Sequence, residues 1–226
     1  MKYRLTEETI QIGGHILHRI ECVTAFAHVK VGDKGGWIES EANLSQYGDA
    51  WVYGDARVYG NARVSGDARV YGGAKVCGDA EVYGGAKVCG DAEVYGCAEV
   101  YDNAKVSGNA EVCGNAEVYD NAWVCDKAEV CGNAEVSGYA GVYGYAKVCG
   151  DAKVCGNADY IVFKNWWSSG RYYTWTRSNN KWRVGCFYGT GEELIAKAYK
   201  DSEVSGREYQ RVVDYVKSIL QDCKPD

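Results

Sequence analysis

A six-residue repeat runs without interruption through the middle of the chain. Every sixth residue from 50 to 158 is alanine, and from Ala50 to Ala152 a valine stands two positions after each alanine. A turn dipeptide, usually Gly-Asp, Gly-Asn or Gly-Gly, separates successive pairs. One unit has only two small apolar side chains and cannot bury a core alone. The units must therefore stack on copies of themselves.

The spacing of the repeat predicts a three-sided coil. An alanine and the valine two residues later lie on the same side of an extended segment, while the residue between them points outward. Glycine, asparagine and aspartate tolerate the left-handed backbone of a tight corner. Three six-residue units then form a coil of 18 residues. Successive coils pair as parallel strands at a spacing of about 4.8 Å.

Sequence units such as V-Y-G-D-A-R resemble the hexapeptide repeat of left-handed parallel β-helix proteins over about residues 37–158. The opening YRLTEETIQIGGHILHRIECVTAF and the later VGDKGGWIESEANLSQYGDAWVYGDARV are similar to a group of uncharacterised bacterial and bacteriophage hexapeptide-repeat proteins. In that group a short N-terminal cap ends in a Gly-Gly-aromatic-Ile segment, here Gly35 to Ile38, and a compact C-terminal domain follows the repeats. The group is often labelled polymer-forming or acyltransferase-like. The resemblance implies this architecture and a phage or prophage origin, with no established activity.

The sequence predicts a mainly β fold, a left-handed parallel β-helix with a cap at each end. Caps are expected because open strand edges invite aggregation. We divide the chain into an N-terminal β cap (1–47), the hexapeptide β-helix (48–158) and a C-terminal α+β domain (159–226). In the cap, strands Thr9–Ile12 and His15–Cys22 flank a Gly-Gly hairpin signal, and Ala42 and Leu44 enter the repeat in phase.

After residue 158 the composition changes sharply, and the pattern predicts three strands followed by two helices, a βββαα order. The expected strands are Tyr160–Lys164, Arg171–Arg177 and Trp182–Tyr188. A capping box that opens at Thr190 begins a helix ending near Lys200. A second box that opens at Ser205 begins a helix to about Gln221.

Residues 18 apart lie above one another, so the outward position between alanine and valine forms three columns. One is basic with a tryptophan near each end: Trp51, Arg69, Lys87, Lys105, Trp123 and Gly141. Two stack glutamates: Arg57, Lys75, Glu93, Glu111, Glu129 and Lys147, then Arg63, Glu81, Glu99, Glu117, Glu135 and Lys153. Residues 79–135 hold 12 acidic residues against three lysines, a net charge of −9. Such a surface keeps a rod soluble, and it can also bind a basic partner.

The position after valine holds mostly tyrosine, cysteine or serine. Tyr83, Tyr101 and Tyr119 form an unbroken column, which either covers the β surface or binds a partner. In another column Cys113, Cys131 and Cys149 stack in succession, 18 residues apart. Cysteine interchanges here with tyrosine and serine, and no C-x-x-C motif or flanking histidine accompanies it. The pattern therefore favours surface filling over a disulfide framework or a metal site, and we expect no cofactor.

The strands after residue 158 are rich in aromatic and basic residues. The preferred interpretation is a core on one face and solvated charge on the other. The alternative is a nucleotide or nucleic-acid binding module that stacks bases and contacts phosphates. Its candidate residues are Trp166, Trp167, Arg171, Tyr173 and Trp175.

The three histidines, His15, His18 and His28, all lie in the N-terminal cap. Hexapeptide-repeat acyltransferases, a second alternative that the resemblance implies, use a histidine base on the β-helix or on a loop thrown out from a coil. No insertion interrupts the repeats here, and the sequence has no Gly-rich phosphate loop, nucleophile elbow or HExxH motif. The sequence therefore favours a non-catalytic protein.

The preferred hypothesis is a rigid scaffold or interaction protein that binds or sequesters a host component. Its expected binding residues are the stacked glutamates Glu81, Glu99, Glu117, Glu135, Glu93, Glu111 and Glu129. A protein partner and self-association are expected. No apolar run approaches the length of a membrane span, and the start MKYRLTEET lacks the apolar segment of a signal peptide. The expected location is the cytoplasm of a bacterial host.

Overall fold

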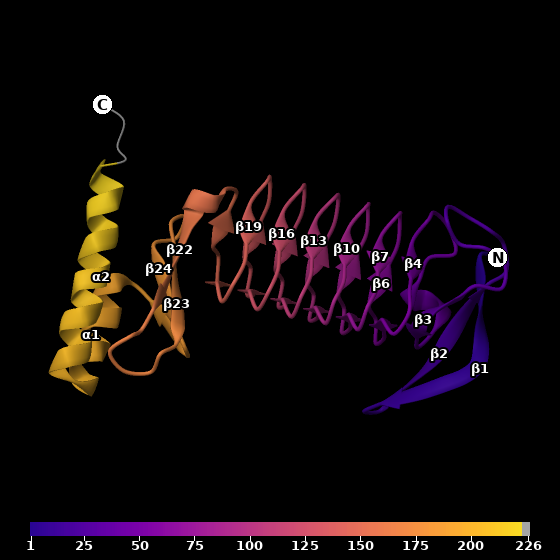
Figure 1. Cartoon of the computed structure of the whole chain (residues 1–226), viewed down its shortest axis with the longest axis horizontal. Coiled ribbons are helices and arrows are strands. Elements are labelled where there is room, and N and C mark those ends of the chain that lie inside the picture. Colours follow the sequence, from indigo (N-terminus) through magenta and orange to yellow (C-terminus); the bar gives the residue numbers. More distant parts are fainter. Residues whose placement is uncertain (223–226) are drawn as a thin grey trace.

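The computed structural model describes residues 1–222 and shows a β-helical rod with a different structure at each end (Figure 1). A β-hairpin lies at the N-terminal end, and a small sheet backed by two helices closes the C-terminal end (Figure 1). Within the described residues, no helix combines the length and the hydropathy needed to cross a membrane.

The rod consists of two-residue strands, and every third strand stacks into the same sheet. We call one sheet the basic sheet, and its strands are β4 (Trp51–Val52), β7 (Arg69–Val70), β10 (Lys87–Val88), β13 (Lys105–Val106), β16 (Trp123–Val124) and β19 (Gly141–Val142). The glutamate sheet comprises β6 (Arg63–Val64), β9 (Glu81–Val82), β12 (Glu99–Val100), β15 (Glu117–Val118), β18 (Glu135–Val136) and β21 (Lys153–Val154).

The third sheet has nine strands because it continues from the rod into the N-terminal cap. Its rod strands are β5 (Arg57–Val58), β8 (Lys75–Val76), β11 (Glu93–Val94), β14 (Glu111–Val112), β17 (Glu129–Val130) and β20 (Lys147–Val148). Its cap strands are β1 (Tyr3–Ile12), β2 (His15–Cys22) and β3 (Lys34–Ile38). The predicted hairpin is confirmed, with β1 starting earlier than expected, and β3 joins the rod by parallel pairing with β5.

In all three sheets, parallel pairing between coils joins residues 18 apart, as Lys87 with Lys105, Glu93 with Glu111 and Glu99 with Glu117 show. The repeat alanines from Ala50 to Ala152 and the valines that follow them are at most 1% exposed. Burying one valine side chain contributes about 1.5–3 kcal/mol. The coils therefore share one continuous core, and the predicted β-helix with 18-residue coils is confirmed.

The corners have the left-handed backbone that the turn dipeptides predict. Gly96 has a φ of 73°, and Asp102 and Asp120 stand at equivalent corners with φ of 55° and 58°. Aspartate tolerates this region better than most residues because its short side chain forms local hydrogen bonds. The Asp120 carboxylate also accepts a hydrogen bond from the next coil, from the N–H of Gly138 at 3.0 Å.

The first coil leaves backbone carbonyls that no preceding coil can satisfy, and the cap supplies donors for them. The buried Lys2 ammonium donates to the carbonyl of Ala50 at 2.8 Å, and burial lowers the pKa of Lys2 to about 8. The Asn43 amide donates to the carbonyl of Ala62 at 2.9 Å. The expectation that Ala42 lies in phase is wrong, because Ala42 is exposed in a short 3-10 helix, Glu41–Asn43, and Asn43 is buried instead.

The C-terminal module, residues 160–222, begins after a short 3-10 helix, Asn157–Asp159. Its antiparallel strands follow one another in the order β22 (Tyr160–Lys164), β23 (Tyr172–Thr176), β24 (Lys181–Val184) and β25 (Phe187–Gly189). The single third strand expected over Trp182–Tyr188 is wrong. A turn with Gly185 at φ 56° divides this segment into β24 and β25, so the order is ββββαα.

Two helices, α1 (Gly191–Asp201) and α2 (Glu203–Asp222), pack on the sheet. The capping box at Thr190 is confirmed, since its hydroxyl accepts from the N–H of Glu193 and its own N–H donates to that carboxylate. The second box is wrong, because Ser205 lies inside α2. The hydroxyl of Ser202 accepts from the N–H of Ser205 instead.

The last coil leaves N–H and C=O groups without a following coil, and polar side chains of residues 157–188 bind them. The Thr174 hydroxyl accepts from the N–H of Lys147 at 2.8 Å, and the Ser178 hydroxyl accepts from the N–H of Lys153 at 2.7 Å. The Tyr188 hydroxyl donates to a carbonyl of the same coil. The sheet of the C-terminal module thus takes the place of a seventh coil.

Thr174→Val is expected to destabilise the protein by about 1–3 kcal/mol, because Thr174 is buried and the N–H of Lys147 would lose its acceptor. Ser178→Ala removes an equivalent hydrogen bond at an exposed position, where water replaces the hydroxyl. It should cost less than about 0.5 kcal/mol. Urea unfolding midpoints of the two variants compare the costs. Equal losses would show that the burial of Thr174 does not govern the effect.

Candidate functional site

The glutamates predicted to stack lie in register on neighbouring strands. Glu81, Glu99, Glu117 and Glu135 pair in succession along the glutamate sheet. Glu93, Glu111 and Glu129 pair in the same way in the nine-stranded sheet. Neighbouring carboxylates on such strands repel one another, and the backbone ladder keeps them aligned. We call these two rows the glutamate ladders.

Basic residues neutralise the ends of both glutamate ladders. In the glutamate sheet, Glu81 lies 3.8 Å from Arg63 and Glu135 lies 2.8 Å from Lys153. In the nine-stranded sheet, Glu93 lies 2.6 Å from Lys75, and Glu129 pairs with Lys147. The ladder carboxylates that remain without an ion pair among the described residues are Glu99, Glu111 and Glu117.

These three central carboxylates accept hydrogen bonds from tyrosine hydroxyls. Tyr83 donates to Glu99 at 2.8 Å and Tyr101 donates to Glu117 at 2.9 Å. Tyr95 makes a longer bond to Glu111, at 3.3 Å. Burial and the adjacent glutamates raise the pKa of Tyr83 and of Tyr101, so both hydroxyls stay protonated and remain donors. The hydrogen bonds therefore hold these carboxylates in position.

The predicted tyrosine column is confirmed. The rings of Tyr83 and Tyr101 stack with centroids 5.0 Å apart and planes 1° apart, and those of Tyr101 and Tyr119 with centroids 5.1 Å apart and planes 4° apart. The column lies beside the longer glutamate ladder because each tyrosine follows the valine of a glutamate strand. The glutamate sheet thus presents aromatic rings and carboxylates on one stiff surface.

At its N-terminal end the basic sheet differs from the predicted column, which had an exposed tryptophan near each end. Trp51 is 1% exposed, since Tyr3 and Phe26 of the N-terminal cap pack edge-on against its ring. The expected surface tryptophan at this end is therefore a core residue. At the other end Trp123 is 48% exposed, and the Lys105 ammonium lies 5.1 Å from the centroid of its ring.

The aromatic residues proposed for nucleotide binding divide into two groups. Tyr173 and Trp175 are 1% and 2% exposed and form the core between the sheet and the helices of the C-terminal module, so neither offers a ring face to a ligand. Trp166 is 75% exposed, while Trp167 is half-buried and packs edge-on against Tyr209 at 4.9 Å. Because Tyr173 and Trp175 pack into the core, these two rings are not accessible for stacking against a base.

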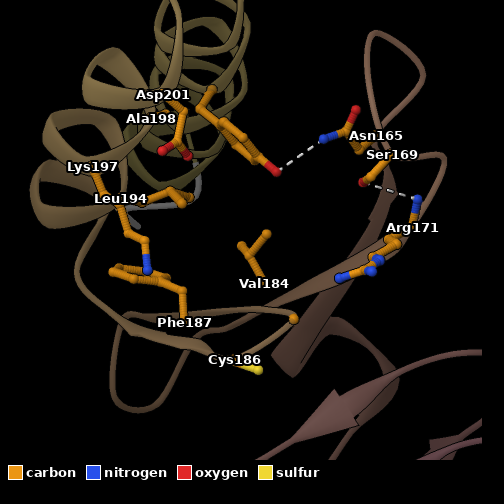
Figure 2. Close-up of a pocket in the computed structure, with 12 residues that line it drawn as sticks. Asn165, Ser169, Arg171, Val184, Cys186, Phe187, Leu194, Lys197, Ala198 and Asp201 are labelled. Carbon is orange, nitrogen blue, oxygen red and sulfur yellow. Dashed lines mark hydrogen bonds between the residues drawn. The ribbon is translucent and has the colours of Figure 1, made fainter.

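A cavity of about 250 Å³ lies in the C-terminal module between α1, the turn after β24 and the loop before β23 (Figure 2). Arg171 lines it, and Lys197 reaches it from α1 with its ammonium 5.6 Å from the ring centroid of Phe187. Small-molecule sites usually enclose about 300–1,000 Å³. The cavity is thus small for a nucleotide, and of the predicted binding residues it includes only Arg171.

Two of the three histidines take part in contacts within the N-terminal cap. The Nδ1 atom of His15 lies 2.9 Å from the Glu39 carboxylate, and this hydrogen bond, together with the N–H of Gly60, lowers the pKa of Glu39. His18 Nδ1 lies 3.1 Å from the backbone carbonyl of Thr6. Glu39 thereby links the cap to the corner at Gly60 in the first coil, and His15 has a structural role there.

The thiols of one column come close together at the C-terminal end of the rod. Cys113, Cys131 and Cys149 follow the valines of β14, β17 and β20, which pair in register. A hydrogen bond with Cys131, together with burial, raises the pKa of Cys113. A hydrogen bond from Cys131 lowers the pKa of Cys149. Sequence analysis identified the column but gave no indication that a carboxylate lies beside it.

Three overlapping segments at the start of the rod, residues 50–64, 56–72 and 62–78, match the family model described as the YdcK β-solenoid repeat. The rod is similar to a YdcK β-solenoid. The matched segments lie in the first coils of the rod. The match supports a β-helix built from repeats, and it does not indicate an activity. A search of the curated proteins finds no match.

Proposed function

We propose that this protein is a non-catalytic scaffold or interaction protein whose rod binds a basic protein partner. The observation that carries the proposal is the pair of glutamate ladders, in which Glu99, Glu111 and Glu117 have no neutralising ion pair within the described residues. A partner with lysine or arginine side chains would gain Coulomb energy from this region and be steered toward it.

The geometry of the surface supports a specific contact over a diffuse one. The carboxylates repeat at about 4.8 Å along each ladder. Tyrosine hydroxyls hold Glu99 and Glu117 in place, so little side-chain freedom is lost when a partner binds. The neutralised ladder ends confine the free charge to the middle of the rod. The binding site we propose is therefore central and spans the glutamate sheet and the nine-stranded sheet.

A second copy of the chain is one partner with suitable chemistry. The basic sheet presents Arg69, Lys87 and Lys105 in register, opposite in charge to the glutamate ladders. Two rods side by side could place these columns against each other, with the subunits forming a homo-oligomer. We propose a bacterial host cytoplasm as the setting and a phage or prophage as the source. Support for both comes from the N-terminal sequence resemblance alone.

The test is a triple charge reversal, Glu99→Lys, Glu111→Lys and Glu117→Lys. Binding to a cationic probe, poly-L-lysine, should weaken at least about tenfold at low salt, since each lost attraction at this distance is worth about 1 kcal/mol or more. The same variant tests self-association by sedimentation. Wild-type binding should also fall as salt rises toward 0.5 M, because salt screens exposed charges.

A matched control carries the same change in net charge at exposed positions outside the ladders, Glu7→Lys, Asp55→Lys and Asp91→Lys. It should retain most of the binding if position matters. Equal weakening in both triple variants would reduce the effect to net charge and would refute a ladder-specific site. Capture of partners from a bacterial lysate with each variant then identifies the natural ligand.

A further inference from the structure

The column of residues that follow the valines of the nine-stranded sheet ends in three successive cysteines. From the first coil to the last it reads Tyr59, Cys77, Tyr95, Cys113, Cys131 and Cys149. In the other two sheets no cysteine stacks on another. Cys89 and Cys125 are separated by Ser107, and Cys155 follows Ser137. Adjacent thiols on neighbouring coils therefore occur at one place in the rod.

A carboxylate completes a cluster at the last two of these thiols. Ligand atoms of Glu129, Cys131 and Cys149 all lie within 4.8 Å of one another. Glu129 reaches the thiols because it stands two residues before Cys131 and points to the same side of β17. Two thiols and one carboxylate form a donor set that suits a soft metal ion.

The spacing of the coils is compatible with two kinds of coordination. With metal–sulfur bonds of about 2.3 Å, two sulfurs on opposite sides of an ion are about 4.6 Å apart, and two sulfurs in a tetrahedral site are about 3.8 Å apart. A ladder spacing of about 4.8 Å is close to the first value. Both separations lie within the 4.8 Å that contains the ligand atoms of this cluster, so a tetrahedral or a wider S–metal–S angle fits, and thiophilic ions with filled d shells accept both.

The surroundings balance the charge of such a site. The Lys147 ammonium pairs with the Glu129 carboxylate and fixes its position beside the thiols. The Nε atom of Arg183 is buried and has no hydrogen-bond partner among the described residues. Cys149 is 5% exposed and Cys131 is half-buried, so water has limited access while an ion can enter beside Cys131.

We propose that Cys131, Cys149 and Glu129 bind one thiophilic metal ion with a filled d shell, of the copper(I), zinc or cadmium class. Each thiol gives its proton to solvent when its sulfur binds the ion, and no oxidant or reductant takes part. The ion would link β17 to β20 next to the C-terminal module, where the Tyr188 hydroxyl already donates to the carbonyl of Cys149. Glu129 is also the last residue of the shorter glutamate ladder, where Lys147 already neutralises it, so the metal site does not use the unpaired carboxylates Glu99, Glu111 and Glu117.

The test uses the full chain in the presence of a phosphine reductant, which keeps the thiols reduced. Titration with Cd²⁺ should produce thiolate-to-metal absorption in the ultraviolet that saturates at one equivalent. Cys131→Ser and Cys149→Ser should each abolish it. Serine suits this position of the fold, since Ser65, Ser107 and Ser137 occupy it on other coils. Glu129→Gln should weaken binding without changing the stoichiometry.

Cys77→Ser is the matched control, because Cys77 lies in the same column between Tyr59 and Tyr95 and has no thiol neighbour. It should leave the titration unchanged. Zn²⁺ and Cu⁺, titrated against a chromophoric competitor, then rank the ions within the class. Lack of a saturable equivalent, its persistence in Cys131→Ser or Cys149→Ser, or its loss in Cys77→Ser would overturn the site.

Discussion

Replacing Val106 with aspartate is expected to unfold the middle of the rod. Val106 is fully buried in the basic sheet, with Val88 and Val124 on the coils beside it. Losing its burial costs about 1.5–3 kcal/mol. An unpaired carboxylate in an apolar core adds several kcal/mol more, even after relaxation. The sum approaches the total stability of an ordinary domain, about 5–15 kcal/mol.

Two companion variants separate the causes of this loss. Asn109→Asp places the same carboxylate on the exposed corner three residues later and should change stability by less than about 0.5 kcal/mol. Val106→Thr keeps the shape of the side chain but buries a hydroxyl, and should cost about 1–3 kcal/mol. Circular dichroism during urea unfolding measures all three. A urea unfolding curve of Val106→Asp that matches that of wild type would contradict the packed Ala–Val core.

Ending the chain after Asp159 is expected to make the rod self-associate. The shortened protein lacks Thr174, Ser178 and Tyr188, so the last coil would expose unpaired N–H and C=O groups along its edge. Exposed strand edges pair readily with other chains. The N-terminal hairpin remains in place, so association should occur through the C-terminal end. Light scattering should show a mass that rises with concentration more steeply than that of the full chain under the same conditions.

A proline on the exposed edge provides the control for the shortened chain. Lys153→Pro removes the N–H that Ser178 binds in the full protein, and proline blocks edge pairing because it cannot donate. This change should reduce association without restoring the module. A shortened chain that remains at constant mass at all concentrations would show that the module does not protect the coil edge.

The rod could be predicted from the sequence because its determinants are local and repeated. Alanine and valine two residues apart define the buried side, and a glycine such as Gly96 defines the corner. The register of the glutamates then follows from the period alone. Some corners have aspartate instead of glycine, as at Asp102 and Asp120, because aspartate also tolerates the left-handed backbone there.

The ends were harder to predict because their contacts join residues far apart in the chain. Lys2 reaches Ala50 and Thr174 reaches Lys147, and no periodic pattern indicates such pairs. Trp51 fits the outward position of its repeat, yet the cap covers it. The division at Gly185 was missed because one glycine among aromatic and β-branched residues is also compatible with a continuous strand.

The candidate site was predicted in part. Stacking of the glutamates followed from the period, but their neutralisation at both ends depends on how long side chains such as Arg63 and Lys147 bend toward a neighbouring coil. Burial of Tyr173 and Trp175 depends on α1 and α2 covering that face of the sheet. Alternation along a strand separates two faces without showing which face is covered.

Because both caps bind single coil edges, the length of this protein can change without redesign of either end. Adding or removing 18 residues would insert or delete one whole coil, and every column beyond it would keep its face. Each coil would lengthen the rod by about 4.8 Å. A change of six residues would instead move every later side chain to the next face and break both glutamate ladders. Genetic duplication in multiples of three repeats could therefore adjust the reach of the rod while preserving its surface chemistry.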